Sequence, residues 1–109
     1  MKILYGFTET RRFLKRIVDR ISDEEYAELQ IYLCENPSAG DLVQGSGGLR
    51  KMRWRISGKG KSGGVRIIYY WAVNREKILM LDIYKKNEKG NLSQSEIAFL
   101  RQNLEDWKR

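Results

Sequence analysis

The sequence contains no histidine and only one cysteine in 109 residues. Without histidine, a Ser-His-Asp triad, a Cys-His dyad and a two-histidine ribonuclease are all excluded. A single cysteine cannot form an internal disulfide, and the lack of both usual ligands argues against a zinc site. Cys34 falls among the apolar residues of a predicted helix, so we expect a buried structural thiol. An enzyme with this sequence must use Lys, Arg, Tyr, Asp or Glu for its chemistry, and we expect no metal or cofactor.

Long apolar runs are also missing. No stretch approaches the roughly 20 apolar residues that a membrane-spanning helix needs, and the N-terminus lacks a signal-peptide pattern. Hydrophobic residues make up 41% of the chain and charged residues 32%, which is typical of a folded protein rather than a disordered one. We therefore expect one cytoplasmic domain over residues 1–109, without a membrane partner.

Acidic residues are absent from one long segment, between Leu42 and Arg75, which holds eight of the 21 basic residues. The remainder of the chain has 13 basic residues against 14 acidic ones, so the whole net charge of +7 comes from this segment. Such a concentration of one charge predicts a phosphate-rich partner. A hairpin that is charged only for solubility is the alternative.

The pattern of apolar residues predicts an α+β fold with the order β-α-α-β-β-β-α. A strand is expected over residues 2–7, then a helix from Thr8 or Thr10 to about Arg20. A second helix should begin at the capping box Ser22–Glu25 and end at Asn36-Pro37. Three strands of an antiparallel meander follow, over residues 49–57, 65–73 and 78–84. Ser93 and Glu96 form a second capping box, which opens the last helix.

Side chains of the meander alternate between apolar and polar or cationic types. If the apolar side chains meet helices packed on one face of the sheet, the other face is open. The apolar set is then Met52, Trp54, Ile67, Tyr69, Leu79 and Leu81, and we expect Leu79, Leu81 and Ile83 to share a face. The open face would carry Lys51, Arg53, Arg66, Tyr70, Tyr84 and Lys86.

Cations interleaved with aromatic rings suit single-stranded RNA, whose phosphates they neutralise and whose bases they can stack upon. RNA cleavage without histidine requires a base for the 2′-hydroxyl, stabilisation of the phosphorane and help for the 5′-oxygen. Like charge lowers the pKa of a lysine, so a lysine crowded by arginines can act as a base. Arginines supply fixed charge for the transition state. These residue types indicate RNA binding and permit cleavage.

Three segments resemble the RelE/HigB family of toxins from bacterial type II toxin–antitoxin modules, closest to the HigB-like branch. They are Gly47-Gly48-Leu49-Arg50-Lys51-Met52-Arg53, the stretch GKGKSGGVRIIYYW, and Ile83-Tyr84-Lys85-Lys86-Asn87-Glu88. The resemblance covers nearly the whole chain and implies a RelE-like fold. It also implies a metal-independent endoribonuclease that cleaves mRNA in the ribosomal A site and so stops translation. The implied partners are the ribosome, mRNA, a cognate antitoxin of helix-turn-helix type, and operator DNA bound through the toxin–antitoxin complex.

The resemblance also implies roles for individual residues. Arg66 matches the transition-state arginine of the family, and the other implied catalytic residues are Lys51, Arg53, Tyr84 and Lys86. The predicted RNA-binding residues are Arg50, Arg55, Lys59, Lys61 and Tyr70. This chain departs from the family pattern at Asn87, where some members have arginine, and near Ser93, where a tyrosine aligns. The base-stacking group is therefore open between Tyr84 and Tyr70.

Two other functions compete with the RNase interpretation. A ParE-like toxin of the same fold family would act on DNA gyrase, but chains of that type lack the dense group of Lys51, Arg53 and Arg66. A non-catalytic RNA-binding relative would keep the charge without the chemistry. The sequence does not decide which residue is general base and which is general acid, nor does it identify the codon preference or the antitoxin.

Overall fold

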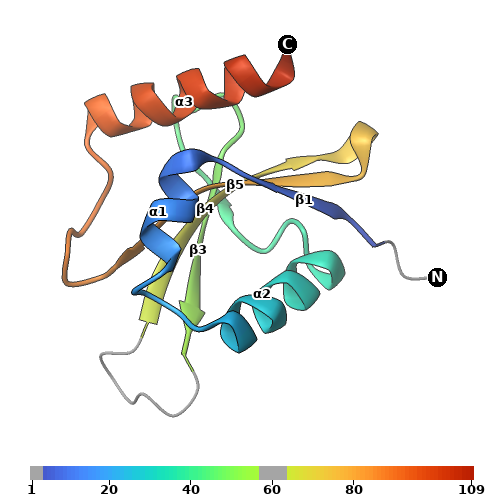
Figure 1. Cartoon of the computed structure of the whole chain (residues 1–109). Helices are drawn as coiled ribbons and strands as arrows, with labels where there is room; N and C mark the ends of the chain where they lie inside the picture. Colours follow the sequence, from blue (N-terminus) through green and yellow to red (C-terminus); the bar gives the residue numbers. More distant parts are fainter. Residues whose placement is uncertain (1–3, 57–63) are drawn as a thin grey trace.

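A five-stranded sheet forms the centre of the protein, in a computed structural model that describes residues 4–56 and 64–109. The strand order is β1-β5-β4-β3-β2, and three α-helices pack on the sheet (Figure 1). The elements are β1 (Gly6–Glu9), α1 (Arg11–Ile17), α2 (Asp23–Glu35), β2 (Asp41–Leu42), β3 (Arg50–Arg55), β4 (Gly64–Ala72), the 3-10 turn η2 (Val73–Arg75), β5 (Lys77–Lys85) and α3 (Gln94–Lys108). No helix within the described residues is long and apolar enough to cross a membrane.

The predicted α+β class and the antiparallel meander are confirmed. Strands β3, β4 and β5 pair antiparallel in chain order, and β1 joins the free edge of β5 in parallel. The two-residue strand β2 was not predicted. It pairs antiparallel with β3, so that Asp41 lies opposite Lys51. It lies in a segment of small and turn-forming residues whose composition reads as loop, so its pairing depends on the neighbouring strand β3.

Helices cover both faces of the sheet, so the prediction that they pack on one face is wrong. Helices α1 and α2 cover a core that includes Phe13, Leu29, Leu33, Met52, Val65, Ile67, Tyr69, Ile78, Met80 and Ile83. Helix α3 covers a second core, formed by Leu49, Ile68, Leu79, Leu81, Tyr84, Leu100 and Leu104. The apolar stripe of α3 has to be buried against apolar side chains. Because α1 and α2 already cover the first face of the sheet, α3 packs on the second.

A β-bulge in β5 explains why the predicted faces of this strand are wrong. Ile68 lies opposite Asp82 but the next residue, Tyr69, lies opposite Met80, so the register shifts by one residue. The extra residue interrupts the alternation of side chains. Leu79 and Leu81 consequently face α3, whereas Ile83 faces α1 and α2. An apolar strand buried on both faces gives no period-two signal from which a bulge could be recognised.

Three hydroxyls cap the three helices. Thr10 accepts from the amide of Phe13 and Ser22 from that of Glu25, while Ser93 and Glu96 form a complete capping box at the start of α3. At Ser22 the structure shows the serine half of the predicted box. The caps satisfy helix amides that have no partner within the helix.

The cap of α3 gives a first test. Ser93→Ala should lower the free energy of unfolding by about 1 kcal/mol, because the amide of Glu96 loses its acceptor. Urea unfolding of this variant, beside Ser38→Ala in the exposed loop before β2, measures the effect. Equal stability of the two variants would contradict the assigned cap.

Candidate functional site

A row of side chains crosses three neighbouring strands on the face that α3 partly covers. Arg53 in β3 lies directly opposite Arg66 in β4, and Arg66 lies directly opposite Tyr84 in β5. Lys51 is two residues from Arg53 along β3 and therefore points to the same face. Arg53 is exposed, and Lys51 and Arg66 are half-buried. We call Lys51, Arg53 and Arg66 the cationic site.

The pairing of Arg53 with Arg66 is unfavourable for folding. Residues directly opposite on antiparallel strands have Cβ atoms about 4.5–5.5 Å apart, and like charges there repel. An anion placed between the two guanidinium groups would remove this repulsion and could accept hydrogen bonds from both of them. The cationic site could therefore bind an anion, and phosphate binding there stays a prediction.

The loop between β5 and α3 borders the cationic site. Lys51 Nζ lies 3.5 Å from Asn91 Oδ1, and Lys89 Nζ lies 4.7 Å from the centroid of the Tyr84 ring. The chain therefore brings a second lysine, Lys89, beside Lys51 and the two arginines of the site. Sequence reasoning missed this residue because the segment around it contains three lysines, and only the folded loop shows which of them lies over Tyr84.

Tyr84 lies on the same face as Arg66, as predicted, but it is not open to solvent. The residue is 0% exposed and belongs to the core beneath α3. Its hydroxyl has no hydrogen-bond partner within the described residues. Burial raises the pKa of this phenol, while the nearby charge of Arg66 acts in the opposite direction. In this conformation Tyr84 cannot stack on a base.

Tyr70, the other candidate for base stacking, lies away from the cationic site. It is four residues from Arg66 along β4, which is about 13 Å at the usual rise of a strand. Its ring packs edge-on to Trp107 at 6.3 Å, and Lys108 Nζ lies 5.1 Å from its centroid. The structure thus places Tyr70 under the end of α3, and not on the open surface that we expected.

The remaining predicted residues are dispersed. Arg50 is half-buried and donates to the carbonyl oxygens of Gly40 at 2.7 Å and Ser38 at 3.3 Å, which fixes the loop before β2. Arg55 and Lys86 are exposed, at the end of β3 and just after β5. Lys59 and Lys61 lie outside the described residues.

Carboxylates near the site are already held by cations. Glu88 binds Arg20 through two oxygens, at 2.6 and 2.9 Å, and accepts from the amide of Lys85 at 2.7 Å. Glu96 pairs with Lys89 and accepts from the amide of Ser93. The hydrogen bonds from Arg20 are the main cause that lowers the pKa of Glu88 to about 2. The hydrogen bond from Lys89 is the main cause that lowers the pKa of Glu96, also to about 2. Both carboxylates are therefore ionised at neutral pH, with pKa values far below the range that suits a general acid or base there.

These two carboxylates predict a pH dependence of stability. A carboxylate whose pKa is lower in the folded state stabilises the protein above its unfolded pKa, here 4.5, and this contribution is lost as the pH falls toward 2. Urea unfolding between pH 5.5 and pH 2.5 should show falling stability, and Glu88→Gln should make the fall shallower. A Glu88→Gln protein with the same pH dependence as the wild type would contradict the assigned ion pair.

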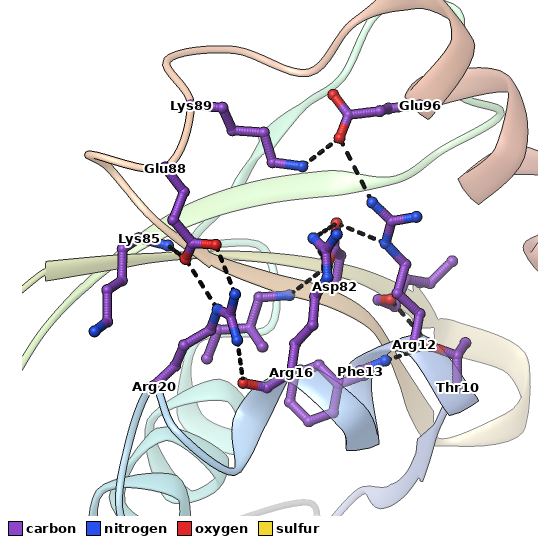
Figure 2. A network of polar contacts seen from close by, with 12 residues as sticks. Thr10, Arg12, Phe13, Arg16, Arg20, Asp82, Lys85, Glu88, Lys89 and Glu96 are labelled. Atoms are coloured by element: carbon purple, nitrogen blue, oxygen red, sulfur yellow. Dashed lines mark hydrogen bonds and ion pairs between the residues drawn. The ribbon is translucent and has the colours of Figure 1, made fainter.

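A buried aspartate fastens α1 to the strand that carries Tyr84 (Figure 2). Asp82 is 0% exposed, and Arg16 Nη1 donates to its two oxygens at 3.0 and 3.4 Å. Arg12 Nε lies 3.2 Å from Oδ2 as an ion pair without hydrogen-bond alignment, and Arg12 Nη2 reaches Glu96 at 3.5 Å. The sequence left these arginines open between solvent and a partner; the structure pairs both with Asp82.

No group of three or more Cys, Asp or Glu side chains that could hold a metal ion occurs in the described part of the chain. A model of the RelE toxin of the RelE/RelB toxin–antitoxin system matches residues 8–108. The chain belongs to the RelE toxin family. The family predicted from the sequence is confirmed, and the assignment to a HigB-like branch stays a prediction.

Solved RelE structures share the fold. The free form of a doubly substituted E. coli RelE toxin superposes with a TM-score of 0.60 at 17% identity, over 95% of this chain and 98% of that one. RelE in the intact E. coli RelBE toxin–antitoxin complex gives 0.54 at 16% identity, over 74% and 95%. The same mutant toxin with a peptide of the antitoxin RelB gives 0.52 at 16%, over 88% and 92%. At these identities the likeness establishes the RelE fold.

Proposed function

We propose that this RelE toxin is a ribosome-dependent endoribonuclease that cleaves mRNA in the ribosomal A site. The observation that carries the proposal is the cationic site, in which Arg53 and Arg66 oppose each other directly with Lys51 on the same face. Unfavourable repulsion between neighbouring cations is typical of a site that a ligand completes. The family match supports the same function.

The cleavage proceeds by attack of a ribose 2′-oxygen on the adjacent phosphorus, with departure of the 5′-oxygen. Negative charge gathers on the phosphorane, where Arg53 and Arg66 would stabilise it with charge fixed in advance. Proton transfer falls to Lys51 and Tyr84, because the nearby carboxylates Glu88 and Glu96 are occupied by cations. Arg55 and Lys86 are exposed, and we assign both to binding the phosphates of flanking nucleotides. For Lys86 this differs from the catalytic role that the resemblance implied.

We also propose that an antitoxin protein neutralises this chain and that the complex binds operator DNA. E. coli RelE, which has the same fold, has been solved with its antitoxin RelB. A cytoplasmic location follows from the proposed substrate, since ribosomes and mRNA are found there. An antitoxin of helix-turn-helix type remains the expectation from the sequence.

Induction of the protein in cells tests the proposal. Primer extension on a translated mRNA and on an untranslated copy of the same mRNA should show cuts in the translated copy only. Cuts in both copies would remove the ribosome from the mechanism. Growth arrest with both messages intact would overturn the RNase function and favour a ParE-like action on gyrase, to be measured by DNA supercoiling. Intact messages and normal growth would leave only RNA binding.

A further inference from the structure

The hydroxyl of Tyr84 is buried beside the cationic site without a partner. The residue is 0% exposed, and its oxygen makes no hydrogen bond with any described residue. A buried hydroxyl without a partner costs stability, and proteins rarely keep one. Its position opposite Arg66 suggests that the missing partner belongs to the bound ligand.

Lys89 lies over the ring of this tyrosine. Its ammonium lies 4.7 Å from the centroid of the Tyr84 ring and is held there by an ion pair with Glu96. Cation–π contact and the ion pair act together to fix the lysine. Figure 2 shows Lys89 and Arg12 both pointing toward the carboxylate of Glu96.

Glu96 is fixed independently of Lys89. Its Oε1 accepts from the amide of Ser93 at 3.0 Å, and its Oε2 lies 3.5 Å from Arg12 Nη2. The pKa of Glu96 is lowered to about 2, chiefly by Lys89 and the amide of Ser93, so the group is an anion at neutral pH. If Lys89 left, Glu96 would still have Arg12 as a counter-ion. Loss of the contact with Lys89 would therefore not leave the charge of Glu96 unpaired.

Resting on the proposed function, we propose that Glu96 is a positioning residue that holds Lys89 across Tyr84 in the free protein and yields it to a phosphate of the bound RNA. A lysine is suited to such an exchange, because its ammonium is a point charge on a flexible stem with three rotatable donors. Departure of Lys89 takes the cation off the ring of Tyr84, while the contacts of the ring with the core beneath α3 remain. The site thus becomes complete only when RNA is present.

Binding of a short fluorescein-labelled oligouridylate, measured by anisotropy at several salt concentrations, tests the exchange. Glu96→Gln keeps the capping interaction with Ser93 but removes the competing charge, so it should bind about two- to fivefold more tightly. Lys89→Met should bind more weakly, with a salt slope smaller by about 0.7. In the Lys89→Met background, Glu96→Gln should have no effect, because the two residues act through one contact.

The matched control is Glu105→Gln, which makes the same change of charge on α3, where Glu105 pairs with Arg101 at 3.9 Å. If Glu96→Gln binds RNA no more tightly than Glu105→Gln, the exchange is wrong. The same conclusion follows if Glu96→Gln keeps its full effect in the Lys89→Met background, or if the wild type does not bind the oligouridylate at low salt.

Nitration by tetranitromethane, followed by peptide mass spectrometry, provides a readout that needs no RNA. Glu96→Gln should raise nitration of Tyr84 severalfold and leave Tyr70 unchanged, whereas Lys108→Ala should raise that of Tyr70 alone. Unchanged protection of Tyr84 in Glu96→Gln would contradict the cover. A chain that shows these effects but leaves ribosome-bound mRNA intact would overturn the proposed nuclease and not the exchange.

Discussion

Replacing Arg66 with alanine is expected to slow cleavage of ribosome-bound mRNA about 10²–10³-fold while the protein stays folded. Arg66 is central in the row, between Arg53 and Tyr84, so its guanidinium is the charge best placed to meet a phosphorane from either side. Loss of one fixed group that stabilises transition-state charge typically has an effect of this size. Single-turnover cleavage with saturating enzyme measures it without a contribution from weakened binding.

The matched control is Arg75→Ala, which removes the same charge from an exposed arginine that contacts Trp107 and the carbonyl of Lys108. It should leave the rate within about twofold of the wild type, since single rim charges act mainly on association. Equal rates for Arg66→Ala and Arg75→Ala would show that Arg66 acts only through net charge. Removing Arg66 also relieves its repulsion with Arg53, so the variant should be at least as stable as the wild type.

The second large effect is expected on stability, at Asp82. Asp82→Asn should lower the free energy of unfolding by about 3 kcal/mol, because breaking a buried ion pair leaves Arg16 without its carboxylate and Arg12 with Glu96 alone. That is a large part of the roughly 5–15 kcal/mol that stabilises a domain. Urea unfolding measures the loss.

Asp106→Asn serves as the control. Asp106 is exposed on α3, and within the described residues its carboxylate accepts one side-chain hydrogen bond, from Gln102. Its effect should stay within about 0.5 kcal/mol. An Asp82→Asn protein as stable as Asp106→Asn would contradict the network in Figure 2. The arginines are 22% and 30% exposed, so water compensates them in part, and the expected loss is at the low end of the range for buried pairs.

The sequence was sufficient to predict the meander and the beginnings of the helices. Strand β3 alternates apolar and cationic residues, so its period is visible, and Ser93 with Glu96 marks the start of α3 by local chemistry. Strand β5 is buried on both sides and carries a bulge, so neither its faces nor the second core could be predicted. The position of α3 could not be predicted either, because α3 packs on that second core.

The same reasons explain which site residues the sequence placed correctly and which it did not. Lys51, Arg53 and Arg66 lie on two strands of clear alternation, and the structure brings them to one face as predicted. Tyr84 and Tyr70 were expected to be open, but α3 and the loop before it cover them. Lys89 acts across a loop, where spacing in the sequence does not determine distance in space.

One measurement tests the central claim most directly: addition of the purified protein to an mRNA alone and to the same mRNA bound to purified ribosomes with an empty A site. Cleavage of the ribosome-bound mRNA within the A-site codon, with the free mRNA intact, is the predicted result. An intact ribosome-bound mRNA, or equal cleavage of both, would contradict a nuclease that works in the ribosome.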